Sequence, residues 1–325
     1  MGIVTNVARY AVIALAGFLV CSQVSGQDFP NKPVRIVVPY GAGGTTDIVT
    51  RIVANRLSVL WGQSIIVDNK PGAGGNIAIE FVARSVPDGY TLLTSGASFA
   101  MNPGLYKKIP YDAEKDFVPI TEIASTPSIL MVRPSLPVNS VKELIDLAKR
   151  SPGDLTYGTA GAGTTPHLAI ELFNSMAGIK MLHIPYKQET MALQDVMNER
   201  VDVYIGSIPS FRPHLRAGRI KGLAVTSSQR SGDLPELPTV AEAGLPGYEM
   251  TGWYGAYAPA GISRDIMKKL QTDFIRAIRD PDTSARLVSA GAGPIASTSA
   301  EFFEFLRAEL KKWAAVVKSS GATID

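Results

Sequence analysis

The sequence predicts an α/β protein in which two lobes of strand-helix units enclose a binding cleft. Short β-branched runs alternate with stretches of helical periodicity, which is typical of parallel sheets covered by helices. Three of the junctions between a strand and the next helix are rich in Gly and Thr. Two extended segments, 121–134 and 248–259, separate these series and fit strands that cross between lobes.

The first series begins with a β-branched strand at residues 34–38, which a glycine loop interrupts. Apolar residues from Val49 to Leu60 then recur at helical spacing, so a helix is expected from about Thr46. The remaining elements of this series are a strand at 64–67, a second glycine loop at 71–75, a helix at 76–84 and a strand at 90–94.

The second series begins with Ser140 and Glu143, which form the pattern of a capping box and predict a helix over 141–150. A third glycine loop lies at 161–165, and the polar stretch 227–237 is expected to be a surface loop. The other predicted elements are strands at 155–158, 181–184, 201–205 and 220–226, and helices at 166–177 and 191–198.

The last third of the chain is predicted to be helical. Ser263 can cap a helix that runs to Pro281, and Thr298 with Glu301 forms a second capping box. Gly321 is expected to end the final helix. Its apolar stripe consists of Phe302, Leu306, Leu310, Trp313 and Val317.

If segments 121–134 and 248–259 are hinges, one lobe contains residues 27–125 together with 255–325, and the other contains 130–247. Two lobes joined by crossing strands have the geometry of a clamp that closes on a ligand.

Composition and net charge argue against several classes of protein. The 325 residues are 46% hydrophobic and 19% charged, enough for about two domains with real cores. The net charge is only +3 and no basic block occurs, which argues against nucleic-acid binding. A single Cys excludes a disulfide framework and a cysteine-ligated zinc site. We expect no cofactor and no metal.

Residues 1–26 have the pattern of a signal peptide. Arg9 is their only charged residue, and the apolar stretch 11–21 is too short to span a bilayer. Small residues before and at Gly26 predict cleavage near that position. Two alternatives are a buried N-terminal helix and a lipoprotein acylated at Cys21, although Val20 precedes that Cys where a small residue is usual.

The glycine loops predict an anion site. A strand-to-helix junction presents unpaired backbone N–H groups at the positive end of the helix dipole, and glycine lets a ligand approach the backbone. Loops 41–46 and 161–165 contain no Lys or Arg, so one carboxylate-sized anion held by dipoles is expected. The alternative is that the glycines only form the turns, and for loop 71–76 neither reading is preferred.

Three side chains near these loops have competing interpretations. Asp47 is either an ordinary helix-start carboxylate or a residue that positions the loop or binds a ligand amine. His167 faces the cleft or packs on a turn, and Tyr186 is a candidate cleft wall. The candidate ligand-binding residues are Tyr40, Gly41, Ala42, Gly43, Gly44, Thr45, Asp47, Gly74, Asn76, Ser95, Ala97, Thr159, Gly163, Thr164, Thr165, His167 and Tyr186.

The sequence does not favour an enzyme, and no catalytic residue is assigned. It contains no G-x-S-x-G nucleophile elbow, no H-E-x-x-H zinc motif and no G-x-x-x-x-G-K-[ST] phosphate loop. The dinucleotide fingerprint also fails, because Ile77 stands where its third glycine would be. His183 is expected in the core and His214 in a solvated polar turn.

The mature chain resembles the Bug family, the substrate-binding proteins of tripartite tricarboxylate transporters, along almost its whole length. The similar stretches are 33–47 (PVRIVVPYGAGGTTD), 67–75 (VDNKPGAGG), 87–93 (PDGYTLL), 157–164 (YGTAGAGT), 184–187 (IPYK), 234–244 (LPELPTVAEAG) and 258–261 (APAG).

The resemblance implies a type 2 periplasmic binding protein fold and capture of small carboxylated solutes. In that family two loops of the first lobe hold a carboxylate through backbone groups and water, and the other lobe closes over the far end. The chain departs from the family pattern after Lys187, where Gln188-Glu189-Thr190 replaces the usual Gly, and at residues 76–79 (NIAI).

We therefore expect a monomeric periplasmic solute-binding protein that delivers a carboxylate to the membrane permease subunits of a tripartite transporter. A carboxylate sensor that presents its bound form to a receptor or kinase is the alternative, and an exported hydrolase is a weaker one. Aspartate, glutamate, citrate, nicotinate and aromatic dicarboxylates all remain candidate ligands.

Overall fold

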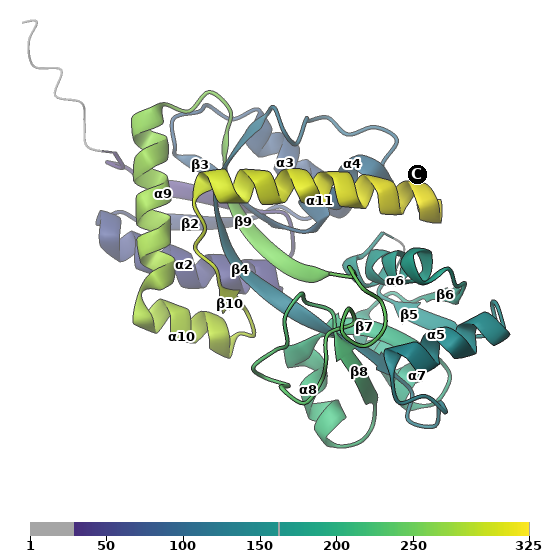
Figure 1. Cartoon of the computed structure of the whole chain (residues 1–325). Helices are drawn as coiled ribbons and strands as arrows, with labels where there is room; N and C mark the ends of the chain where they lie inside the picture. Colours follow the sequence, from purple (N-terminus) through teal and green to yellow (C-terminus); the bar gives the residue numbers. More distant parts are fainter. Residues whose placement is uncertain (1–28, 162, 325) are drawn as a thin grey trace, which may run out of the picture.

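The computed structural model describes residues 29–161 and 163–324, so the predicted signal peptide and its cleavage site lie outside the described residues. Figure 1 shows two α/β bodies joined by two long strands, β4 and β9. No helix in the described part of the chain combines the length and apolar character needed to cross a membrane.

The first body is built around β1, which pairs in parallel with both β2 and β3. This is the parallel arrangement predicted from the first βα series. Its elements in chain order are β1 (Val34–Val38), α2 (Thr45–Trp61), β2 (Ile65–Asn69), the 3₁₀ turn η2 (Ala73–Gly75), α3 (Asn76–Ala83), β3 (Thr91–Gly96) and α4 (Ser98–Leu105).

The second body is built around β5, which pairs in parallel with β6 and β7. Ser140 caps its first helix as predicted, but Glu143 reaches the backbone N–H of Asn139 instead of that of Ser140. The elements are α5 (Val141–Arg150), β5 (Thr156–Thr159), α6 (Thr165–Ala177), β6 (Leu182–Pro185), α7 (Glu189–Met197), β7 (Val203–Ser207), α8 (Ile208–Arg216) and β8 (Lys221–Val225).

Two antiparallel strands connect the bodies. β4 (Phe117–Val132) pairs with β9 (Thr251–Pro259) along Phe117–Pro127, and from Ser128 to Val132 it pairs with β7 and β8. β4 therefore runs without a break from the first sheet into the second. The sheet order is β2-β1-β3-β9-β4-β7-β5-β6, with β8 and β10 (Gly293–Pro294) also paired to β4.

The C-terminal region packs on the first body and reaches the second. Thr298 and Glu301 form the predicted capping box of α11 (Ser299–Ser320), and Gly321 ends that helix in the left-handed region. The apolar stripe is buried at Phe302, Leu306, Trp313 and Val317 and partly buried at Leu310. In Figure 1 this helix lies along the first body and extends toward α6.

Three helices were not predicted. α4 contains Pro103, and α8 contains Pro213, so both segments resemble turns in sequence. His214 therefore lies in the last turn of α8 and not in a polar turn. The helix that begins after Ser263 is α9 (Arg264–Arg279), and Pro281 opens a new helix, α10 (Pro281–Ser289), whose N-cap is Asp280.

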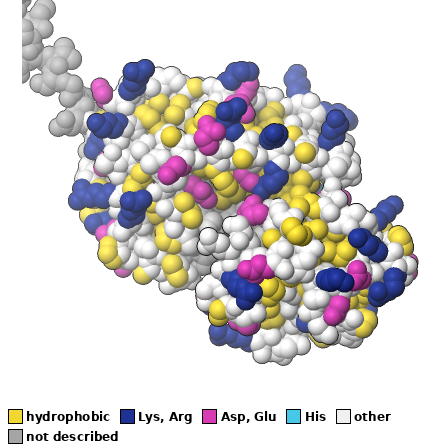
Figure 2. Space-filling model, in the orientation of Figure 1, with side chains coloured by type: hydrophobic (Ala, Val, Ile, Leu, Met, Phe, Trp, Pro, Cys, Tyr) yellow, Lys and Arg dark blue, Asp and Glu magenta, His cyan; other side chains and the backbone are white. Residues whose placement is uncertain are grey.

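Charged side chains of both signs are interspersed over the face drawn in Figure 2, on both bodies. This agrees with the small net charge of the sequence and with the absence of a basic block. An extended field of one sign, as nucleic-acid binding requires, is not formed on this face.

Candidate functional site

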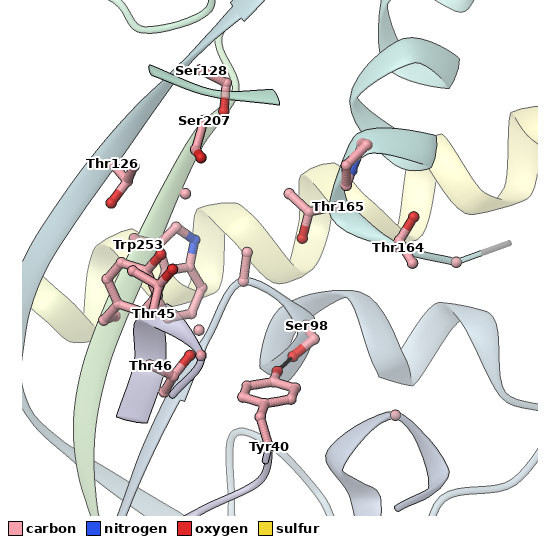
Figure 3. Close-up of a pocket in the computed structure, with 18 of the residues that line it drawn as sticks. Tyr40, Thr45, Thr46, Ser98, Thr126, Ser128, Thr164, Thr165, Ser207 and Trp253 are labelled. Carbon is pink, nitrogen blue, oxygen red and sulfur yellow. Dashed lines mark hydrogen bonds between the residues drawn. The ribbon is translucent and has the colours of Figure 1, made fainter. Parts of the chain in front are cut away.

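A cleft of about 550 Å³ lies where the two bodies and the two connecting strands meet. Hydroxyl groups from all these parts face it: Thr45 and Thr46 at the start of α2, Thr164 and Thr165 across the opening at α6, and further residues of β4 and β7 (Figure 3). A cleft of this size accommodates a small organic molecule.

Part of the predicted site lines this cleft. The residues that the sequence had singled out and that the structure brings together here are Tyr40, Gly44, Thr45, Gly74, Ala97, Gly163, Thr164 and Thr165.

The turn before α2 presents backbone donors to the cleft. Gly43 has φ +84°, a conformation that favours glycine, and its N–H donates to Asp47 Oδ2 at 2.9 Å. Gly44 is the N-cap and offers no side-chain cap. The N–H groups of Thr45, Thr46 and Asp47 therefore have no acceptor among the described residues and remain available at the helix start.

Asp47 holds this turn in place. It is 2% exposed and accepts hydrogen bonds from Gly43, from Arg51 Nε at 2.9 Å and from Asn69 Nδ2 at 3.0 Å. Burial alone would raise the pKa of Asp47, but these hydrogen bonds and the Arg51 charge lower it below its ordinary value. The interpretation of Asp47 as a loop-positioning residue thus agrees with its contacts.

The turn before α6 repeats this design. Residues 41–47 read GAGGTTD and residues 161–167 read GAGTTPH. Gly163 has φ +74°, and its N–H donates to His167 Nδ1 at 3.0 Å, just as Gly43 donates to Asp47. His167 is 7% exposed and outside the cleft lining, so it positions its loop. The similarity of residues 41–47 and 161–167 in the sequence was the feature from which the matching roles of Asp47 and His167 could have been predicted.

His167 is part of an aromatic stack. Its ring centroid lies 4.2 Å from that of His183, which lies 4.9 Å from that of Tyr157. Burial lowers the pKa of His167, and burial with the neighbouring His167 lowers the pKa of His183 to about 4. Both rings are therefore neutral at pH 7, which leaves His167 Nδ1 free to accept the Gly163 N–H.

Other predicted residues lie behind the cleft wall. Asn76 accepts hydrogen bonds from Asn102 and Tyr111, both at 2.8 Å, and Asn102 also binds the Gly74 carbonyl at 3.0 Å. The Tyr186 hydroxyl donates to Asp195 at 2.8 Å instead of facing the cleft. Outside the lining are Gly41, Ala42, Gly43, Asp47, Asn76, Ser95, Thr159, His167 and Tyr186.

The connecting strands contribute residues that sequence reasoning missed. Trp253 on β9 lines the cleft, and its indole N–H donates to Glu309 Oε2 of α11 at 2.8 Å. Trp313 donates to the same oxygen at 2.8 Å. Thr46, which belongs to the predicted loop 41–46, also lines the cleft. The other additions to the lining are Gly96, Ser98, Asn102, Tyr106, Thr126, Ser128, Pro166, Glu189, Ile205, Gly206, Ser207, Met250, Gly252, Tyr254 and Ile324.

No Lys, Arg or His side chain lines the cleft in the described part of the chain, and Glu189 is the one charged residue there. The described residues also contain no cluster of His, Cys, Asp and Glu that could hold a metal ion. An anion in this cleft would therefore be held by backbone N–H groups and hydroxyls.

Comparison with known proteins identifies similar chains. A family model described as "Tripartite tricarboxylate transporter family receptor" (TctC) matches residues 49–322. Protein BugT of Bordetella pertussis is 33% identical over 314 residues, which cover 96% of this chain and 96% of BugT.

Solved structures agree with this similarity. Rpa4515 of R. palustris with adipate is 38% identical, with a TM-score of 0.77 over 91% of this chain and 100% of that one. MatC (Rpa3494) from Rhodopseudomonas palustris with bound malate is 30% identical, with a TM-score of 0.74 over 89% of this chain and 100% of that one. The fold is therefore that of the two-lobed TctC and Bug binding proteins.

Proposed function

Since the chain belongs to the TctC family of tripartite tricarboxylate transporter receptors, together with the Bug proteins, we propose that it captures a small carboxylate in its cleft. The observation that carries this proposal is the pair of matched turns, at 41–47 and 161–167, that meet at the cleft without a cationic side chain. Relatives solved with adipate and malate support the carboxylate class.

The chemistry of the turns favours an anion of carboxylate size. Three N–H groups at the start of α2 lack acceptors among the described residues, and the helix dipole adds positive potential there. The hydroxyls of Thr45 and Ser98 also line the cleft. Ligand contacts that the protein does not make directly would be made through water.

The test is a calorimetric titration with dicarboxylates and their neutral diamides, with two glycine variants. Gly44 lines the cleft, has φ −73° and tolerates a side chain, so Gly44→Ala adds a methyl group where the ligand must approach. We expect carboxylates but not diamides to bind, and Gly44→Ala to weaken binding about tenfold, or about 1.4 kcal/mol.

Gly41→Ala is the matched control, because Gly41 has open space around it and lies outside the lining. It should change affinity less than about twofold. Equal binding of diamides and carboxylates would contradict the proposal.

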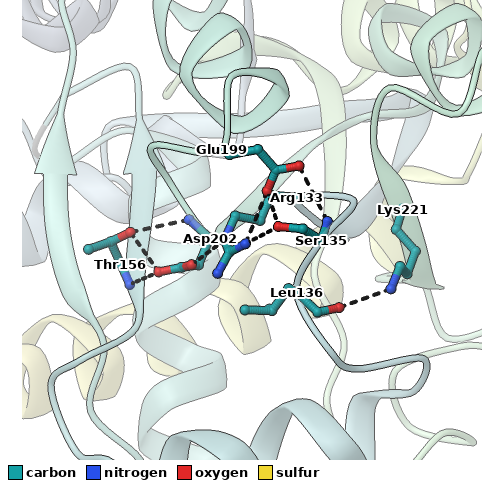
Figure 4. Close-up of polar contacts among 7 residues, drawn as sticks. All are labelled: Arg133, Ser135, Leu136, Thr156, Glu199, Asp202 and Lys221. Carbon is teal, nitrogen blue, oxygen red and sulfur yellow. Dashed lines mark hydrogen bonds and ion pairs between the residues drawn. The ribbon is translucent and has the colours of Figure 1, made fainter.

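We further propose that the two bodies are the lobes of a clamp, with residues 27–125 and 255–325 in one, 130–247 in the other, and hinges at 121–134 and 248–259. Polar contacts support treating the second body as one unit (Figure 4). Arg133, the residue after β4, pairs with Asp202 at 2.7 Å between its Nε and Asp202 Oδ1, and Asp202 Oδ2 accepts the backbone N–H of Thr156 on β5 at 2.8 Å.

Small-angle X-ray scattering tests the clamp. With a saturating carboxylate, the radius of gyration should fall below that of the ligand-free protein, because closure brings the lobes together. The diamide that does not bind is the control for solvent contrast. An unchanged radius of gyration at full occupancy would argue against closure.

The proposal extends to location and partner. We propose that the protein is exported with cleavage near Gly26 and, as a monomer, delivers its ligand to transporter membrane subunits. The leader pattern supports the export, and the family supports the delivery. No catalytic role is proposed. Presentation of the closed form to a sensor ectodomain would use the same cleft, and a pull-down with the ligand-bound protein distinguishes the two partners.

A further inference from the structure

Glu189 is an unusual residue for a cleft that binds anions. It is the first residue of α7, which belongs to the second body, and it is the one charged side chain in the described lining. A fixed negative charge beside a bound carboxylate would oppose binding unless the ligand carries a group that this charge attracts.

The Glu189 carboxylate has no partner among residues 29–161 and 163–324. No described residue forms a hydrogen bond or an ion pair with it. By contrast, the buried carboxylates Asp47 and Glu309 are each paired with a basic side chain, Arg51 and Lys312 respectively. An acidic group that lines a cavity without a partner can accept hydrogen bonds from a ligand.

The surroundings of Glu189 also disfavour an uncompensated negative charge. Burial raises the pKa of Glu189, and the Tyr204 hydroxyl nearby is buried with no hydrogen-bond partner among the described residues. Burial, together with the Glu189 charge, also raises the pKa of Tyr204. A cation delivered by a ligand would offset the cost of a charged carboxylate in this environment.

The two kinds of group lie on different bodies. The donors at the start of α2 belong to the first body, and Glu189 belongs to the second, so a ligand that bridges the cleft meets donors at one side and an acceptor at the other. We propose that Glu189 selects carboxylates that also carry an ammonium group, so that the ligand is an amino acid. This inference rests on the proposed function.

The experiment uses pairs of acids that differ in the amino group: glutamate with glutarate, aspartate with succinate, and 4-(aminomethyl)benzoate with 4-methylbenzoate. Calorimetry on the full mature chain measures the affinity for each acid. Within each pair that binds, the acid with the amino group should bind roughly tenfold more tightly or better than the acid without it. Glu189→Gln, which keeps the size of the side chain, should remove most of this preference, and Glu189→Lys should reverse it.

Glu236→Gln is the control, since it changes the net charge equally at an exposed position of the second body. It should leave the preference intact. Melting curves of the ligand-free variants separate folding from selection. A lower melting temperature with an unchanged preference would make Glu189 a helix-start residue only and overturn the inference.

Two further outcomes separate failure of this inference from failure of the proposed function. If glutarate binds as tightly as glutamate in the unchanged protein, the inference fails while the proposed carboxylate function stands. If no acid of any pair binds, and the wider carboxylate screen is also negative, the proposed function itself fails.

Discussion

Asp47→Ala is expected to weaken carboxylate binding by at least about tenfold, although Asp47 does not line the cleft. The substitution removes the acceptor for the Gly43 N–H, for Arg51 Nε and for Asn69 Nδ2. The turn that presents the α2 N–H groups then loses its support. A buried donor left without a partner costs about 1–3 kcal/mol, so the melting temperature should fall as well.

Asp47→Asn is the matched variant, because it retains one acceptor oxygen but places an NH₂ group among donors. Its affinity should lie between those of the unchanged protein and Asp47→Ala in a calorimetric titration. Full affinity in Asp47→Ala would mean that the turn keeps its geometry without this carboxylate, and that Asp47 is an ordinary helix-start residue.

Glu309→Ala is expected to cost about 3–5 kcal/mol of unfolding free energy, the range for breaking a buried ion pair. Glu309 is 4% exposed and accepts the indole N–H groups of Trp253 and Trp313 while pairing with Lys312. Its removal leaves two buried donors and a partly buried cation. Because Trp253 lines the cleft, affinity should fall together with stability.

Glu304→Ala on the same helix is the control. Glu304 is exposed, and its Oε1 lies 4.0 Å from Arg307 Nη1, so this variant removes only a long surface ion pair. Its unfolding free energy should stay within about 0.5 kcal/mol of the unchanged protein. Denaturant unfolding followed by circular dichroism measures both variants. Similar losses for Glu304→Ala and Glu309→Ala would show that the Trp253 anchor contributes little.

The strand-loop-helix units of both bodies could be predicted from the sequence because their signals are local. β-branched runs, glycine loops and capping residues placed the start of α2 and both ends of α5 and α11 within one or two residues of those observed. α4 could not be found in this way, because Pro103 and Gly104 indicate a turn. Packing stabilises this helix instead: Phe99 is fully buried and stacks on Tyr257 at 4.5 Å.

Residues of the cleft lining could be named from the sequence where they belong to glycine turns, but not where they belong to the connecting strands. Gly44 and Thr45 were identifiable because a glycine turn before a helix has a known chemistry. Whether Ser128, Ser207 or Trp253 faces the cleft depends on how β4, β7 and β9 assemble, which no local pattern specifies.

The start of α10, by contrast, could have been predicted from the sequence, because Asp280 followed by Pro281 is a typical helix start.

The unbroken course of β4 has a mechanical consequence. A flexible glycine linker would act as a free joint and leave the two bodies to diffuse independently. β4 and β9 instead form a paired ribbon, whose backbone hydrogen bonds resist stretching and shear while its twist can still change. Beyond Pro127 the ribbon ends and β4 continues into pairing with β7 and β8, so one strand belongs to both sheets and a twist of it would turn one body relative to the other.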